Sequence, residues 1–527
     1  MEKLLPILCC WMIAFPAHAE GRSGRLETYL SAKFPSKIER VSVGEKEITL
    51  SGTADRDVSL AAIPMERQLD DTGPLEIVSA IKAGKFSVTV PRNDRLSHRW
   101  QLVDGTTPAS HARYPDEVAC RAPDLPPAML KSKKGLGGWN AGRIPGELGE
   151  LGISSVTVNV KIDSLVSLQP VPGSTPFEWN GRIYHAREKQ LAALDRTFVE
   201  AEKLGVMVSA ILLVGNPARE NSEIVRLLGH PEATKDGIFA MPNVTSTEGI
   251  ALYGAILNLM AERWSMPNSP HGRVHQWIMH NEVDAGREWT NAGEKSAIEF
   301  MDLYQRSMRL MDLISRQYDP NSRVLISLTH HWTDPGKKEW YGSKPLLELL
   351  VRFGEAEGDF RWGVAYHPYP QSLLHPRTWE DSQATHDPNT AKITPKNLEV
   401  LDVYMKQPRL LDRHGDVRPV HLSENGFNSK DYSPEVLAEQ AAAMAYAWKK
   451  IAALSSIRAW EYHNWIDNRQ EYGLRIGLRK YPDEPGDPLG KKPIWHLYQA
   501  LSTPREEEAC APYLKVTGLS SWDQIIR

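Results

Sequence analysis

The chain has 527 residues, a formal net charge of −4 and a pI near 6.5. This charge balance gives no general electrostatic attraction to nucleic acid or to anionic membranes, so neither is expected as a partner. The length exceeds what one hydrophobic core usually holds, so we expect two domains.

Residues 1–19 have the pattern of a secretory signal peptide. A short apolar run at 4–15 follows Lys3 and leads to Ala17-His18-Ala19, which has the small-x-small form that signal peptidase cuts. We therefore expect cleavage after Ala19 and a secreted or periplasmic protein. The apolar run is too short to span a bilayer, and no later stretch is long enough, so no membrane insertion is expected.

Two cysteines, Cys120 and Cys510, remain after the signal peptide is removed. In an exported protein they can form a disulfide, which would tie the region between the domains to the C-terminal tail. Two free, buried cysteines are the alternative. The sequence leaves both possibilities open, and it also leaves the oligomeric state unknown.

The region 20–120 is predicted to be a small all-β sandwich. Runs such as "RVSVGEKEITLSG" and "KFSVTVPR" alternate apolar and polar residues between polar or Gly/Pro turns. Residues 121–137 are first Pro-rich and then Gly-rich, as expected for a linker and the entry to a second domain. That domain should occupy 128–505, followed by a C-terminal tail at 506–527.

The second domain alternates buried strands with helices, which is typical of right-handed βαβ units around a parallel sheet. We expect strands at 134–139, 154–160, 206–214, 274–282, 323–329, 360–369, 418–424 and 457–465. Eight such units indicate a (β/α)8 barrel, a TIM barrel of the α/β class. An open doubly wound sheet is the alternative, but no Gly-x-Gly-x-x-Gly follows any strand. Long insertions follow several strand ends, on the face where barrel enzymes build their sites.

Two glutamates lie at strand ends of this predicted barrel. Glu282 ends the fourth strand in "HNEVDAG", and Glu424 ends the seventh in "HLSENGF". A pair of carboxyl groups about 5–5.5 Å apart suits glycoside hydrolysis with retention, and about 6.5–9.5 Å suits inversion. Either glutamate alone is more simply a loop cap or a salt bridge, but the pair favours catalysis.

This arrangement resembles glycoside hydrolase clan A, whose members are retaining glycosidases on (β/α)8 barrels, over residues 128–505. The resemblance implies that Glu282 is the acid/base and Glu424 the nucleophile. It also implies that Asn281 binds a sugar 2-hydroxyl.

Two further motifs carry the resemblance. His367-Pro368-Tyr369 matches the His-x-Tyr that many members have at strand six, where the phenol orients the nucleophile. Trp465, at the end of strand eight, matches the Trp that lies beneath the sugar. The chain departs from the pattern at His280, where a Trp is frequent, and at Val283, where Pro is frequent. These departures block assignment to a sugar, to a linkage, or to endo or exo action.

Other residues are weaker candidates for contact with substrate. His280, His330, Trp139 and Asn140 all lie at or near predicted strand ends. Asp284 is predicted to cap a loop, because Gly286 follows it in a turn-like sequence.

The sequence therefore predicts a secreted retaining glycoside hydrolase that cleaves a poly- or oligosaccharide without a cofactor or metal. The pKa of Glu282 must be raised by an apolar wall or a neighbouring carboxylate, while Tyr369 keeps Glu424 ionised. Three alternatives stay open: a carbohydrate-binding protein on an inactive barrel, a metal-dependent hydrolase that uses the strand-end histidines, and a transglycosidase. The sandwich is expected to brace the barrel rather than bind glycan, since it has no evident aromatic platform.

Overall fold

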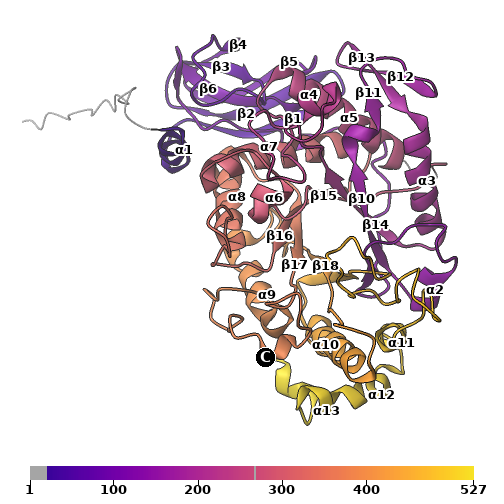
Figure 1. Ribbon diagram of the computed structural model, residues 1–527. Coiled ribbons are helices and arrows are strands. Elements are labelled where there is room, and N and C mark those ends of the chain that lie inside the picture. Colours follow the sequence, from indigo (N-terminus) through magenta and orange to yellow (C-terminus); the bar gives the residue numbers. More distant parts are fainter. Residues whose placement is uncertain (1–20, 266–268) are drawn as a thin grey trace, which may run out of the picture.

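The computed structural model describes residues 21–265 and 269–527, so the predicted signal peptide lies outside the described residues. The N-terminal β domain, drawn in indigo in Figure 1, lies against one side of a larger α/β domain. The C-terminal helices α12 (Glu506–Cys510) and α13 (Leu514–Thr517) lie at the far end from the β domain.

The β domain consists of two four-stranded sheets and confirms the predicted sandwich. One sheet has the order β5-β2-β1-β8 and the other β4-β3-β6-β7. In β2, alternate residues such as Ile48 and Leu50 are buried, which explains the alternating sequence. The strands are β1 (Lys37–Val43), β2 (Glu47–Ala54), β3 (Val58–Ile63), β4 (Glu76–Ile81), β5 (Gly84–Pro91), β6 (Arg99–Asp104), β7 (Thr107–Pro108) and β8 (Glu117–Val118), preceded by the helix α1 (Arg22–Ser31).

The second domain is a closed barrel of eight parallel strands, which confirms the predicted fold class. Its order is β10-β14-β15-β16-β17-β18-β19-β9. The strands are β9 (Lys134–Leu136), β10 (Ser155–Lys161), β14 (Met207–Leu213), β15 (Gln276–Met279), β16 (Arg323–Thr329), β17 (Trp362–His367), β18 (Val420–Asn425) and β19 (Ile457–Tyr462). In chain order β9 is the first barrel strand, β15 the fourth and β18 the seventh.

Helices connect successive barrel strands and cover the outside of the barrel. They are α2 (Glu147–Leu151), α3 (Glu188–Lys203), α4 (Glu223–Leu228), α5 (Thr247–Ser265), α6 (Gly286–Trp289), α7 (Ala297–Ser315), α8 (Ser343–Glu357), α9 (Glu399–Met405), α10 (Pro434–Ala453) and α11 (Pro493–Ala500). The insertion after β10 forms a small antiparallel sheet of β11 (Val166–Ser167), β12 (Ser174–Trp179) and β13 (Arg182–Arg187). Among residues 21–265 and 269–527, no helix has the length and apolar character needed to cross a membrane.

The short first barrel strand is held mainly by the last part of the chain. Lys133 Nζ donates to the carbonyls of Ile451 and Leu454, each at 2.7 Å, at the end of α10. Lys134 Nζ donates to the carbonyl of Leu501 at 3.1 Å. β9 pairs with β19 through three residues and with β10 through two. The barrel is thus closed by contacts between its first and last units.

A buried polar interface joins the sandwich to the helices α7 and α8. Glu357, at the end of α8, is 1% exposed and accepts hydrogen bonds from Arg99 Nη1 at 3.1 Å and the Tyr29 hydroxyl at 3.2 Å. Arg306 of α7 donates to the carbonyl of Met65 at 2.8 Å. These contacts fit the expected bracing role of the sandwich.

Cys120 and Cys510 do not form the disulfide that the sequence left open, and both are free thiols. Cys120 interacts electrostatically with Asp319 and Arg316, near the end of α7, whereas Cys510 interacts with Lys449 on α10. The two cysteines therefore lie in different parts of the protein. Burial raises the pKa of Cys510 to about 12, so this thiol stays protonated.

Candidate active site

Glu282 and Glu424 meet at one end of the barrel. Glu282 lies three residues beyond the end of β15, and Glu424 is the second-last residue of β18. One oxygen of each carboxyl group and one ring nitrogen of His367 all lie within 4.8 Å of one another. This closeness is compatible with the short spacing of retaining glycosidases.

An unusual backbone conformation at Glu282 directs its side chain. Glu282 has a φ of 40°, in the left-handed region that non-glycine residues seldom adopt. Its N–H donates to Ser327 Oγ at 2.9 Å, and its Oε1 lies 2.9 Å from His367 Nδ1. Such strain is retained where surrounding contacts determine the conformation, and it is common at functional sites.

The pKa of Glu282 is raised from 4.5 to about 7. Burial is the main cause, and the negative charge of Glu288 on α6 adds to it. The neighbouring carboxylate that contributes is thus Glu288, six residues further along the chain. Glu288 is held by Lys337 Nζ at 2.5 Å and by the indole N–H of Trp340. Glu282 can therefore keep its proton near neutral pH.

Glu424 accepts a hydrogen bond of 2.9 Å from the Tyr369 hydroxyl, as the resemblance implied. Burial and the charge of Glu424 raise the pKa of Tyr369 well above its usual value, so the phenol remains a donor. His367 Nε2 lies 3.0 Å from Ser423 Oγ, and burial lowers the pKa of His367. A neutral imidazole therefore links the strand of Glu424 to Glu282.

The structure adds His463 and Glu471, which sequence reasoning missed. His463 directly follows β19 and donates from Nε2 to Glu471 Oε2 at 3.2 Å. Burial opposes its protonation, but the charges of Glu424 and Glu471 prevail and raise the pKa of His463. The sequence did contain a signal for His463. Side chains alternate between the two faces of a strand, so a residue two positions after the inward-facing Glu461 should also face the barrel interior.

Trp465 does not lie beneath the site, contrary to the prediction. Its side chain is fully buried, and Nε1 donates to Glu147 Oε2 at 2.8 Å. Glu147 also accepts from Arg479 Nε at 2.8 Å, so this tryptophan belongs to a packed polar cluster under α11. It presents no ring face to a ligand, and His463 lies nearer to the two carboxyl groups.

His280 also differs from the prediction, because it is a core residue. It is 1% exposed, and its Nδ1 donates to the carbonyl of Leu212 at 3.1 Å. Its Nε2 lies 2.8 Å from Ser307 Oγ on α7, so both ring nitrogens are used within the protein. Burial lowers the pKa of His280 to about 4. The ring has no free polar atom to offer a sugar.

The remaining candidates divide into two groups. The side-chain amide of Asn281 makes no hydrogen bond to any residue that the structure describes, so it is free for a ligand. His330 interacts with the backbone of Tyr369 at the rim of the barrel. Trp139 is 6% exposed and lines a separate cavity of about 480 Å³ against α3. Asn140 is exposed in the same loop. Among the described residues, the hydrogen-bond partners of the Glu282 and Glu424 side chains are His367 and Tyr369, and not these two residues.

Asp284 links its loop to a neighbouring strand, whereas the sequence predicted a cap of the turn at Gly286. It is fully buried and accepts from the Thr329 N–H at 2.9 Å and the Thr329 hydroxyl at 2.6 Å. It thereby ties the loop after β15 to the end of β16. Burial raises its pKa from 3.8 to about 7.

Comparison with solved structures gives remote similarities. A family 39 glycoside hydrolase from Bacteroides cellulosilyticus WH2 shows 14% identity and a TM-score of 0.45, covering 89% of this chain and 83% of that one. The exo-β-1,4-mannosidase Op5Man5 from Opitutaceae bacterium strain TAV5 shows 15% identity and a TM-score of 0.42, covering 74% and 63%. β-Glucuronidase 2 of Bacteroides uniformis shows 12% identity and a TM-score of 0.39, and the match covers 88% of this chain and 49% of that one. The chain thus spans about half the length of that enzyme.

None of the curated proteins compared with the chain matches it. The closed barrel carries Glu282 and Glu424 at the ends of its fourth and seventh strands, as expected from the sequence. One family model matches residues 126–525, which include the whole barrel. By this match, the chain belongs to the family of unknown function DUF5722.

Proposed function

We propose that the protein is an exported glycosidase that cleaves β-linked poly- or oligosaccharides by double displacement. The observation that carries this proposal is the difference between two adjacent carboxyl groups. Glu282 has a pKa of about 7, while Glu424 accepts a hydrogen bond from Tyr369. One group can thus donate a proton while the other attacks as an anion.

In the first step, a Glu424 carboxylate oxygen attacks the anomeric carbon and forms an ester bond. The bond from that carbon to the leaving oxygen breaks, and this oxygen takes the proton of Glu282. In the second step, Glu282 accepts a proton from water as the water oxygen attacks the anomeric carbon. The ester bond breaks in the same step and releases Glu424 as a carboxylate.

Neighbouring residues support these roles. Tyr369 orients Glu424 and stabilises its charge through a hydrogen bond from a protonated phenol. His367 holds Glu282 at 2.9 Å. Asn281 carries a free amide beside Glu282 and would bind a sugar hydroxyl. His463, paired with Glu471, supplies a further donor next to Glu424.

The first test measures sugar release from a panel of plant, algal and microbial polysaccharides and aryl β-glycosides. We expect the mature protein to cleave at least one, and Glu424→Ala to be inactive on it. Glu435→Ala, on the exposed start of α10, is the matched control and should retain full activity. Full activity of Glu424→Ala would refute the assignment.

Azide gives a second test, specific for Glu282. Glu282→Ala should form a glycosyl azide of retained configuration from a substrate whose leaving group needs no protonation. A product of inverted configuration, or no azide product, would contradict the double displacement. Sequencing the N-terminus of the exported protein tests cleavage after Ala19.

A metal-dependent hydrolase is a second candidate, because Glu282, His367 and Glu424 could also hold a divalent ion. Carboxylates and imidazole are suitable ligands for zinc. Loss of activity with a chelator and its return with added zinc would favour this candidate. Specific binding of a glycan without any cleavage would instead favour a binding protein.

A further inference from the structure

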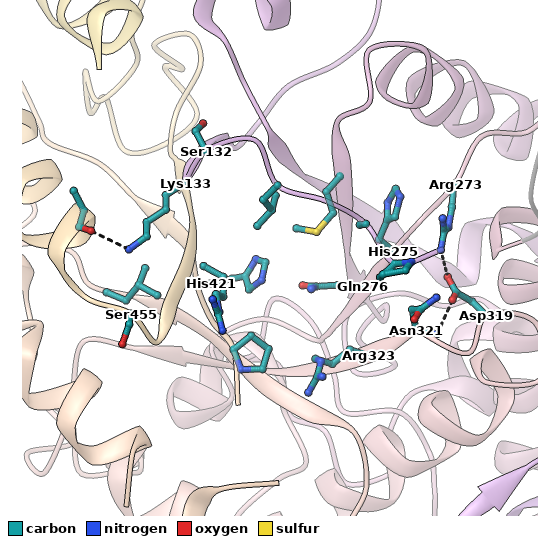
Figure 2. Close-up of a pocket in the computed structure, with 18 of the residues that line it drawn as sticks. Ser132, Lys133, Arg273, His275, Gln276, Asp319, Asn321, Arg323, His421 and Ser455 are labelled. Carbon is teal, nitrogen blue, oxygen red and sulfur yellow. Dashed lines mark hydrogen bonds and ion pairs between the residues drawn. The ribbon is translucent and has the colours of Figure 1, made fainter. Parts of the chain in front are cut away.

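A cavity of about 740 Å³ lies at the end of the barrel opposite the two catalytic glutamates (Figure 2). It is formed at the amino-terminal ends of the strands, where β15 begins at Gln276, β16 at Arg323 and β19 at Ile457. Glu282 and Glu424 lie at the carboxyl ends of their strands. The cavity is therefore separate from the proposed active site.

Positive charge dominates the lining of this cavity. Lys133, Arg273, Arg323 and Arg458 contribute four cationic groups. Among the described lining residues, Asp319 is the one carboxylate, and it is paired with Arg273 Nη2 at 2.8 Å. Figure 2 shows this pair at one edge of the hollow. Three cationic side chains thus have no carboxylate of the lining beside them.

The surroundings offset this charge only in part, although Asp412 and Asp312 raise the pKa of Arg323 and Asp402 raises that of Lys133. Burial and the positive charges of Arg418 and Arg361 lower the pKa of Arg323. Burial and the charge of Arg458 likewise lower the pKa of Lys133. Like charges that depress one another's pKa values indicate a site of positive potential, which an anion would relieve.

Two uncharged side chains of the lining can form hydrogen bonds with a ligand. His275 Nδ1 accepts a hydrogen bond from the Val208 N–H at 3.1 Å, so the ring proton lies on Nε2. Burial lowers the pKa of His275 to about 3, which keeps the ring neutral and Nε2–H a donor. The Gln276 side chain lies in the middle of the hollow, and its amide oxygen has no partner among the described residues. A ligand with acceptor oxygens and a hydroxyl group would match both.

We propose that this cavity binds a small oxyanion that also carries a hydroxyl group, such as hydrogen phosphate or a sugar acid. Arg323 and Arg458 would neutralise the anion, His275 would donate to it, and the Gln276 oxygen would accept its hydroxyl. This site is independent of the proposed glycosidase activity.

The test is calorimetric titration of the full mature protein at constant ionic strength with inorganic phosphate, D-glucuronate and glucose. Phosphate or glucuronate should bind, and neutral glucose should not bind at this site. Arg323→Gln and Arg458→Ser should each weaken binding by about 10-fold or more, as expected for loss of a charged hydrogen bond. Arg323→Lys should restore part of the affinity. The control Arg196→Ser, on the exposed side of α3, should bind like the wild type.

Comparing phosphate with glucuronate shows which kind of anion the site prefers. Tighter binding of phosphate assigns a phosphate site, and tighter binding of glucuronate assigns a sugar-acid site. The proposal is overturned if the wild type binds neither anion or if both arginine variants bind them unchanged. It is also overturned if Glu424→Gln abolishes binding, since that would locate the anion in the active site. Arg458 is exposed, so Arg458→Ser remains a valid test if Arg323→Gln does not fold.

Discussion

Replacing Glu288 with Gln should move the pH dependence of activity without removing a catalytic group. The negative charge of Glu288 is the second cause, after burial, of the raised pKa of Glu282. Gln keeps the shape of the side chain and its ability to accept from Trp340, but it removes the charge. The acid form of Glu282 should therefore be lost at lower pH.

The size of the effect has clear bounds. With a pKa of about 7, half of the Glu282 side chains are protonated at pH 7, whereas at the ordinary 4.5 only about 0.3% would be. Complete loss of the shift would thus lower kcat/KM at pH 7 by about 150-fold. Since burial remains in Glu288→Gln, the midpoint of the alkaline limb should fall below that of the wild type but stay above 4.5.

The assay is kcat/KM against pH on two aryl glycosides of the sugar identified by the substrate panel. A poor leaving group requires the Glu282 proton and should report the shifted limb. A good leaving group does not require it and should show little change. Glu339→Gln, an exposed residue of the neighbouring loop, is the charge-matched control. An unchanged or higher midpoint in Glu288→Gln would refute the electrostatic reasoning.

Three further changes test other parts of the structure. Tyr369→Phe removes the donor to Glu424 and should lower kcat by about 10²-fold with a well-folded protein, so an unchanged kcat would contradict the role of the phenol. Glu357→Ala leaves the charge of Arg99 buried and unpaired, so it should lower the free energy of unfolding in urea by about 3–5 kcal/mol. Adding Arg99→Met should recover part of this loss. No loss in Glu357→Ala would show that the interface does not brace the barrel. Asp284→Asn removes a carboxyl whose pKa is raised from 3.8 to about 7. The folded wild type binds that proton more tightly than the unfolded chain, so its stability should fall as pH rises through this window, and the variant should lose less; equal slopes in urea melts at several pH values would count against this.

The fold and the proximity of Glu282 to Glu424 could be predicted because they depend on regular patterns. Buried strands alternate with helices along the chain, and a closed parallel barrel brings all strand carboxyl ends to one face. Glu282, Glu424 and Tyr369 lie at such ends, so their proximity follows from topology.

The rest of the site depends on the long insertions, whose folding has no simple periodic signal. Glu471 reaches His463 from the insertion after β19, and Trp340 reaches Glu288 from the insertion after β16. Trp465 was misplaced for a related reason. Its buried partner Glu147 lies 318 residues away in sequence, and no local pattern connects the two.

The closure of the barrel has a consequence for how the chain is made. Domains generally fold as units during synthesis, beginning with N-terminal segments. Here β9 pairs most extensively with β19, which is the last strand of the barrel. The carbonyl groups that accept hydrogen bonds from the side chains of Lys133 and Lys134 also lie beyond residue 450. A nascent chain therefore carries an unclosed sheet edge through most of translation. The export that we propose, if it precedes folding, would defer this edge pairing until the whole chain is present.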